Sequence, residues 1–146
     1  MSHRGWVRFF ARFMLGLIFF MAGWHKCFVM TPLGHARFYF TGPYADTWIP
    51  HWLLLVTGTV VPVVELLAGA LLLVGFRVRY ALIALGMILL LVTYGHLLKE
   101  PLFSIIDHIF PRFILLALVF LMPAEDDRFS LDTWLQIGRA SCRERV

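Results

Sequence analysis

The chain has 146 residues, of which 60% are hydrophobic and 15% are charged, and its formal net charge is +4. About 25% of the residues of an ordinary soluble domain are charged, so this composition excludes that class of protein. Four apolar segments instead have about the 20 residues that a helix needs to cross a bilayer. They predict an all-α polytopic membrane protein, a bundle of four transmembrane helices over residues 12–30, 52–76, 80–98 and 102–122.

The first apolar segment follows a basic start that contains Arg4, Arg8 and Arg12. Its apolar part is too long for the core of a cleaved signal peptide, and no small-x-small cleavage site follows it. We therefore expect residues 12–30 to remain in the protein as its first helix.

The connection between the first and second apolar segments, TPLGHARFYFTGPYADTWIPHW, is long and contains three prolines. Tyr44, Trp48 and Trp52 in this connection are typical of the aromatic belt at a membrane interface. Proline clusters also favour loops over regular helices. The pattern predicts an external loop that lies on the membrane surface.

The distribution of basic residues predicts the orientation, because short cytoplasmic loops are enriched in lysine and arginine. Four spans place both ends of the chain on one side, together with the tight connection GFRVR between the second and third spans. We therefore expect both termini in the cytoplasm, on the side that holds Arg4, Arg8, Arg12, Arg77, Arg79 and Arg128.

The last ten residues, IGRASCRERV, resemble a short-read sequencing adaptor translated in one frame. We therefore expect a single membrane domain over residues 1–136 and a disordered, adaptor-derived tail over 137–146. Without the tail the net charge is +2, from 10 Lys and Arg against 8 Asp and Glu, so no nucleic-acid partner is indicated. Cys27 then remains as a single cysteine, which excludes an intrachain disulfide and leaves open a disulfide with a partner protein.

Lys26 lies within an apolar segment, where a charged side chain costs several kcal/mol unless it is paired or reaches water. It is 14 residues beyond Arg12, and Glu65 is 12 residues before Arg77. Helices rise about 1.5 Å per residue, so the two side chains are expected at nearly the same depth. The sequence therefore predicts Glu65 as the partner of Lys26.

Other polar residues are expected in the same layer of the membrane, in its middle and outer half. Near Glu65, Pro62 lacks an N–H group and so frees the carbonyl near residue 58. The remaining candidates, counted by helical rise from the membrane edges, are His25, Tyr94, His96, Asp107 and His108.

Two interpretations of this layer stay open. In the first, Lys26 and Glu65 form a structural ion pair while the histidines reach the outer interface. In the second, the same groups line a small pocket that binds a polar head or relays protons, as ionisable residues within membranes commonly do. His25 and His96 could ligate haem across helices, and His96, Asp107 and His108 have the side-chain types of a metal site, but neither set has diagnostic spacing.

These residues resemble the DoxX family over roughly residues 8–132. The stretch RFMLGLIFFMAGWHK is similar to the first helix of that family, and VELLAGALLLVGFRVRYALI resembles the helix that carries its glutamate, here Glu65. The ending RFSLD resembles the closing signature of the family, although PAEDD replaces the usual glycine-rich lead-in. The matching positions are Arg12, Gly16, Phe19, Gly23, Lys26, Ser130, Leu131 and Asp132.

The resemblance implies a four-helix protein of the bacterial inner membrane, associated with a quinone-linked redox assembly. A small non-catalytic subunit would then hold a quinone head in its polar layer, with no covalently bound cofactor, and oxidoreductase subunits and lipid would be its partners. Whether the chain catalyses a reaction stays open. The alternative is a small-molecule carrier or a membrane scaffold without electron chemistry.

Overall fold

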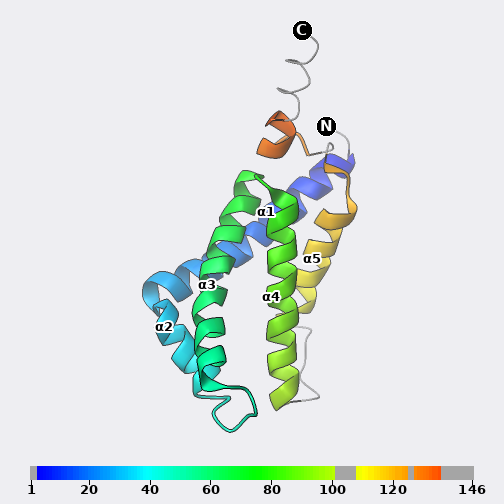
Figure 1. Cartoon of the computed structure of the whole chain (residues 1–146). Coiled ribbons are helices and arrows are strands. Elements are labelled where there is room, and N and C mark those ends of the chain that lie inside the picture. Colours follow the sequence, from blue (N-terminus) through cyan, green and yellow to red (C-terminus); the bar gives the residue numbers. More distant parts are fainter. Residues whose placement is uncertain (1–2, 101–107, 125–126, 136–146) are drawn as a thin grey trace, which may run out of the picture.

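The computed structural model describes residues 3–100, 108–124 and 127–135. This part of the chain is helical and contains no strand (Figure 1). The elements in chain order are α1 (His3–Trp24), the π-helical turn η1 (His25–Val29), α2 (Pro32–His35), the π-helical η2 (Ala36–Thr41), α3 (His51–Val74), α4 (Val78–Lys99) and α5 (Phe110–Leu121).

Three stretches are long and apolar enough to cross a membrane, namely His3–Val29, His51–Val74 and Val78–Lys99. The fourth apolar helix, α5, is shorter at 12 residues. It begins at Phe110, whereas the predicted segment begins at residue 102, and residues 101–107 lie outside the described part. The predicted all-α, multi-pass membrane class is confirmed.

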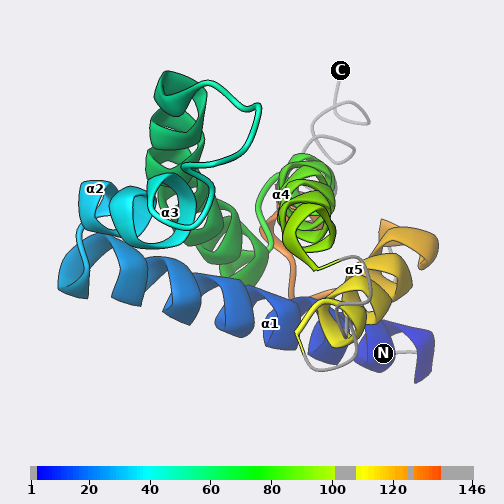
Figure 2. The same ribbon diagram turned by 90° about the horizontal axis from the view of Figure 1, so that it is seen from below.

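The long helices α3 and α4 run antiparallel, and α1 crosses them obliquely on one side (Figures 1 and 2). The start of α1, the α3–α4 turn and the segment 127–135 lie together at one end of the bundle. The connection between η2 and α3 lies at the opposite end. We call these the turn end and the connection end. The predicted tail, 137–146, lies outside the described residues.

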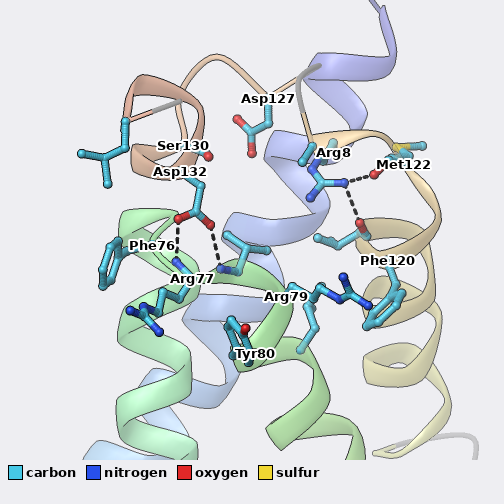
Figure 3. Close-up of a pocket in the computed structure, with 15 residues that line it drawn as sticks. Arg8, Phe76, Arg77, Arg79, Tyr80, Phe120, Met122, Asp127, Ser130 and Asp132 are labelled. Atoms are coloured by element: carbon cyan, nitrogen blue, oxygen red, sulfur yellow. Dashed lines mark hydrogen bonds between the residues drawn. The ribbon is translucent and has the colours of Figure 1, made fainter. Parts of the chain in front are cut away.

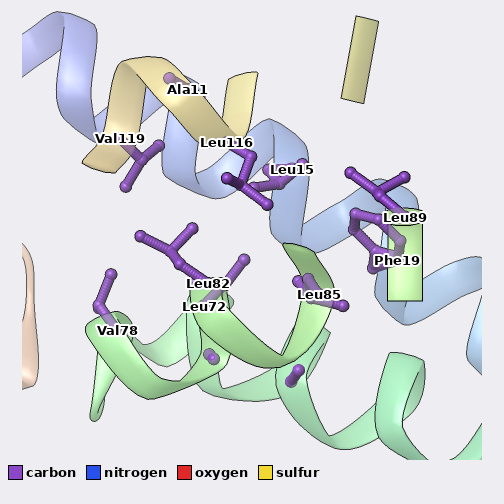
Figure 4. Close-up of a cluster of buried hydrophobic side chains, with 12 residues drawn as sticks. Ala11, Leu15, Phe19, Leu72, Val78, Leu82, Leu85, Leu89, Leu116 and Val119 are labelled. Carbon is purple, nitrogen blue, oxygen red and sulfur yellow. The ribbon is translucent and has the colours of Figure 1, made fainter. Parts of the chain in front are cut away.

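A cluster of buried aliphatic and aromatic side chains holds the helices together at the middle of the bundle (Figure 4). It joins α1, α3, α4 and α5 through fully buried side chains, so each helix has one face against this core. The largest members with almost no exposed surface are Leu15, Phe19, Leu72, Leu85 and Val119.

Glycines allow α1 and α3 to approach closely, as small residues do between membrane helices. A Cβ atom added at Gly23 would lie 2.4 Å from the backbone nitrogen of Leu66, and one at Gly69 would lie 2.5 Å from that of Phe20. Neither position tolerates a larger side chain without moving a backbone. The α1–α3 interface is therefore fixed by backbone-to-backbone contact.

The prediction of a surface loop after the first helix is wrong for residues 32–41, which form α2 and η2. Thr31 begins α2 by accepting a hydrogen bond from the Gly34 N–H at 3.1 Å, and Pro32 occupies the first turn, where its missing N–H costs nothing. The segment packs against α3, where Ala36 contacts the backbone at Gly58. Because α1 crosses α3 obliquely, part of the α3 surface stays free of α1, and α2 and η2 pack on α3 beside it.

Arg12 is completely buried at the turn end, where it joins three parts of the chain. Its Nε atom is 2.7 Å from Oδ2 of Asp127. Its guanidinium group also donates to the carbonyl oxygens of Leu72 and Leu73 in the last turn of α3, and to that of Phe129. Carbonyls in the last turn of a helix have no partner within the helix, and a cation there is favourable.

Arg8, one turn earlier on α1, serves α5 in the same way. It donates to the carbonyl of Val119 at 2.8 Å and to that of Met122. Two arginines on one face of α1 thus bond the carbonyl-bearing ends of two other helices. The distribution of basic residues in the sequence indicated only the side of the membrane on which both arginines lie.

The segment 127–135 closes the α3–α4 turn. Gly75 adopts a left-handed conformation with φ of 73°, and its carbonyl accepts from the Asp132 N–H at 3.0 Å. The Asp132 carboxylate accepts from the backbone N–H groups of Arg77 and Val78, which begin α4, at 2.8 and 2.9 Å. The N-cap residue of α4 is Arg77, and the Asp132 side chain supplies from a distant segment the acceptors that the start of this helix lacks.

We predict that Gly23→Ala destabilises the bundle by about 1–3 kcal/mol, because the new methyl group must push Leu66 away. Gly86→Ala on α4 is the matched control, since its added Cβ would lie 3.8 Å from Leu116 in ordinary contact. It should leave stability unchanged or raise it by up to about 1 kcal/mol. Unfolding by SDS titration in mixed micelles measures both, and equal losses would contradict the close α1–α3 approach.

Arg12→Met should destabilise the protein by about 3–5 kcal/mol, because Asp127 becomes an uncompensated buried charge. Adding Asp127→Asn should recover part of this loss, and Arg4→Met, at an exposed position on the same helix, should cost less than about 0.5 kcal/mol. The same SDS titration tests all three variants. A full additive loss in the double variant would show that Arg12 and Asp127 are not coupled.

Candidate functional site

The predicted partner of Lys26 is confirmed, since its Nζ atom lies 2.6 Å from Oε2 of Glu65. The Glu65 side chain is 5% exposed and that of Lys26 is 26% exposed. The pair joins η1 to α3 on the connection-end side of Gly23, where α1 and α3 are in backbone contact. The close approach of α1 and α3 at Gly23 thus brings their backbones near enough for Lys26 to reach Glu65.

Lys26 lies in the π-helical turn η1 rather than in the regular helix α1. Single π-helical turns within helices are found frequently at functional sites. The extra residue in such a turn changes the direction of the side chains that follow. Here it accompanies the change of direction from α1 toward α2.

The ion pair borders a cavity of about 170 Å³ between α1, α3, α4 and the start of α5. Its apolar wall consists of Phe19, Ile88, Leu89, Val92 and Ile109. Its polar groups are Lys26, Glu65, His96, His108 and Arg112. Four of the residues that the sequence analysis grouped by depth therefore do meet, in what we call the ion-pair cavity.

The other predicted members do not line this cavity. His25 follows α1 on an exposed face, and Tyr94 is 53% exposed. Asp107 lies outside the described residues. The structure therefore places His25 and Tyr94 outside the lining of this cavity, and their membership of a functional site stays a prediction.

Arg112 is a member that the sequence analysis missed. It lies in the first turn of α5 and lines the cavity together with His108, which lies in the turn before this helix. Its guanidinium carbon lies 5.6 Å from the centre of the Phe19 ring, within the range of a cation–π contact. The His-x-x-x-Arg spacing within an apolar segment was the available signal.

His35 is a second residue that the sequence analysis missed. The carbonyl of Gly58, which Pro62 leaves without its helical partner, lies 2.8 Å from Nδ1 of His35. A carbonyl oxygen only accepts, so His35 donates from Nδ1. Burial lowers the pKa of His35, which lies in the connection between two spans, below its ordinary value of about 6.5 and favours the neutral ring. The free carbonyl near residue 58 was predicted from Pro62, and the structure shows that its hydrogen-bond partner is His35 of α2.

The charges of the ion-pair cavity favour an oxygen-bearing ligand. Among the described residues that line it, Lys26 and Arg112 carry positive charges and Glu65 carries the one carboxylate. His96 is held by a hydrogen bond of 2.8 Å between its Nδ1 and the carbonyl of Val92, which fixes its ring at the cavity wall. Cations and N–H donors in a region of low dielectric bind carbonyl or anionic oxygens strongly.

The size of the cavity limits what it can hold. Pockets for drug-sized ligands are about 300–1,000 Å³, so a cavity of about 170 Å³ is small. At about 30 Å³ for each water, it holds roughly five waters or one small polar ring. Among the described residues, no group of three His, Cys, Asp or Glu side chains is arranged to hold a metal ion.

The fold and the site define a small multi-pass membrane protein with a polar cavity inside an apolar helix bundle. The family model of the methylamine utilisation protein MauE matches residues 4–99, from α1 through α4. The chain belongs to the MauE family. The match supports the class of small multi-helix membrane protein that the resemblance to DoxX implied, while DoxX membership itself stays a prediction. Neither the curated proteins nor the solved structures gave a match.

Lys26→Met should cost about 3–5 kcal/mol of stability, because it leaves the Glu65 carboxylate buried and unpaired. Glu65→Gln should cost less, since Lys26 is partly exposed and can turn its ammonium group toward water. The double variant should recover much of the loss. A double-mutant cycle by SDS titration measures the coupling, and losses that simply add would show that the pair contributes nothing.

Proposed function

We propose that the protein is a small inner-membrane subunit of a quinone-linked redox assembly and that its ion-pair cavity receives the quinone head. The observation that carries the proposal is the cavity itself, in which Lys26, Arg112 and two histidines surround a buried Glu65. Partner proteins would supply the redox centres, so no reaction is assigned to this chain.

The side chains of the cavity suit the two ends of a quinone head. Lys26 and Arg112 are positioned to donate hydrogen bonds to a carbonyl oxygen, and Glu65 can accept or release a proton beside it. His96 and His108 continue the polar lining on α4 and at the start of α5, and they offer the proton a path away from Glu65. A head of one small ring fits the volume, and its apolar tail would lie outside among lipid.

The family gives independent support, because its name connects it to methylamine utilisation. Methylamine is a reduced compound, and its oxidation releases electrons that a membrane quinone can accept. For the orientation we propose a cytoplasmic turn end in a bacterial inner membrane, since that end carries Arg4, Arg77, Arg79 and Arg128. The ion-pair cavity then opens in the middle to outer part of the bilayer.

The proposal predicts that the protein, extracted from its membrane in polymer-bounded lipid discs, retains quinone. Lys26→Met/Glu65→Gln should lower the amount of quinone per protein about tenfold, the effect of losing one charge-assisted hydrogen bond. Tyr94→Phe is the matched control, because Tyr94 is a polar residue of α4 that does not line the cavity. Mass spectrometry of the extracted small molecules gives the ratio.

Two results would contradict the proposal. One is an equal amount of quinone in the wild type and in discs that hold an unrelated membrane protein. The other is retention of a polar solute in place of quinone, lost in the double variant and kept in Tyr94→Phe. This second result would favour the carrier alternative, with the same cavity as its binding site.

A further inference from the structure

A second and larger pocket, of about 890 Å³, lies at the turn end (Figure 3). It is bounded by the α3–α4 turn, the first turns of α4, the last turn of α5 and the segment 127–135. Its volume is in the range of about 300–1,000 Å³ that is typical of ligand sites. The ion-pair cavity lies elsewhere, and the proposed function makes no use of this turn-end pocket.

Two acidic groups among the described residues border the turn-end pocket, and the protein itself engages both. Asp127 is bonded to the buried Arg12, and Asp132 accepts from the backbone amides of Arg77 and Val78. Neither carboxylate therefore needs a basic side chain of the pocket to balance it.

The exposed arginines of the pocket are Arg77 and Arg79, at the start of α4. No acidic side chain among the described residues forms a salt bridge with either. The Arg77 guanidinium carbon lies 5.8 and 5.9 Å from the ring centres of Phe76 and Tyr80, which hold it at the rim. Figure 3 shows Arg79 directed toward Phe120 of α5. The rim thus presents two positive charges.

The wall below this rim is apolar. The exposed apolar side chain of this wall is Phe120 of α5, at 48%, whereas Leu82 and Val119 border the pocket as buried members of the core. Next to Phe120, Leu121 is 83% exposed, so apolar surface continues out of the pocket toward the surroundings of the bundle. The pocket therefore combines a basic rim at the end of the apolar helices with an apolar wall that a hydrocarbon chain can follow.

We propose that the turn-end pocket binds an anionic phospholipid, with its phosphate at Arg77 and Arg79 and an acyl chain along Phe120 and Leu121 of α5. Basic pockets between membrane helices at this level bind acidic lipid headgroups. Arginine donates two parallel N–H groups to a phosphate, which a soluble anion and a lipid head share. The apolar wall favours the lipid, because a soluble phosphate would leave that wall uncovered.

The test uses the full chain, stripped of lipid in detergent and titrated with phosphatidylglycerol, phosphatidylcholine or inorganic phosphate, with native mass spectrometry as the readout. Phosphatidylglycerol should bind at least about tenfold more tightly than phosphatidylcholine. Arg77→Gln/Arg79→Gln should weaken phosphatidylglycerol binding about 10- to 30-fold, because each arginine is expected to contribute one contact with the charged headgroup.

The matched control is Arg4→Gln/Arg128→Gln, which removes two exposed arginines of the same end that do not line the pocket. It should change the affinity less than about threefold. If the double variant at 77 and 79 fails to fold, Arg79→Gln alone should still weaken binding about fivefold, because position 79 has an ordinary helical backbone.

Equal losses in the two double variants would overturn the assignment of the lipid to this pocket. If millimolar inorganic phosphate displaces phosphatidylglycerol and the two bind equally tightly, the pocket is a site for soluble anions. That result would overturn the proposal that its ligand is a phospholipid. Selective binding of phosphatidylglycerol that phosphate does not displace would support it.

Discussion

The buried guanidinium group of Arg12 is the contact on which the arrangement of this bundle depends. It binds α1 to the carbonyl end of α3 and, through Asp127, to the segment that closes the α3–α4 turn. Removing a cation from water costs several kcal/mol, and that cost is offset only where its donors find acceptors. Asp127 and three carbonyl oxygens accept four of the five N–H groups, which holds the start of α1 in one place and one direction.

The position of the ion-pair cavity follows from this anchor. From Arg12 onward, α1 can cross α3 only where glycine permits, and Gly69 and Gly23 mark the line of contact. Fourteen residues beyond Arg12, that line brings Lys26 to Glu65. The oblique course of α1 also leaves part of α3 uncovered, and α2 covers it with His35 bonded to the carbonyl that Pro62 frees. The carbonyl that the proline leaves free is thus satisfied by a group of the protein.

The sequence permits prediction of distances along a helix better than of contacts between helix ends. Lys26 and Glu65 could be paired because helical rise is regular, and Gly58 could be singled out because proline always removes the same hydrogen bond. The burial of Arg8 and Arg12 could not be predicted, since orphan carbonyls at the end of α3 or α5 leave no mark in a hydrophobic pattern. His35 was missed because three nearby prolines indicated a loop, although one of them begins a helix. Arg112 could not be assigned to the cavity because the sequence does not show which face of α5 lies against Phe19.

The two pockets share one feature of the bundle, the interface between α4 and α5. The ion-pair cavity is bordered by Val92 and His96 of α4 near the connection end, and the turn-end pocket by Leu82 of α4 and Val119 of α5. Between them the two helices meet through core side chains such as Leu85 and Leu116. No glycine draws α4 and α5 together as Gly23 and Gly69 draw α1 to α3, since even at Gly86 an added Cβ would make only ordinary contact. Packing by side chains alone leaves room for a pocket toward each end of this interface. For both proposed ligands this arrangement implies sideways entry from the bilayer, with the polar head among the charged residues and the tail still in the membrane.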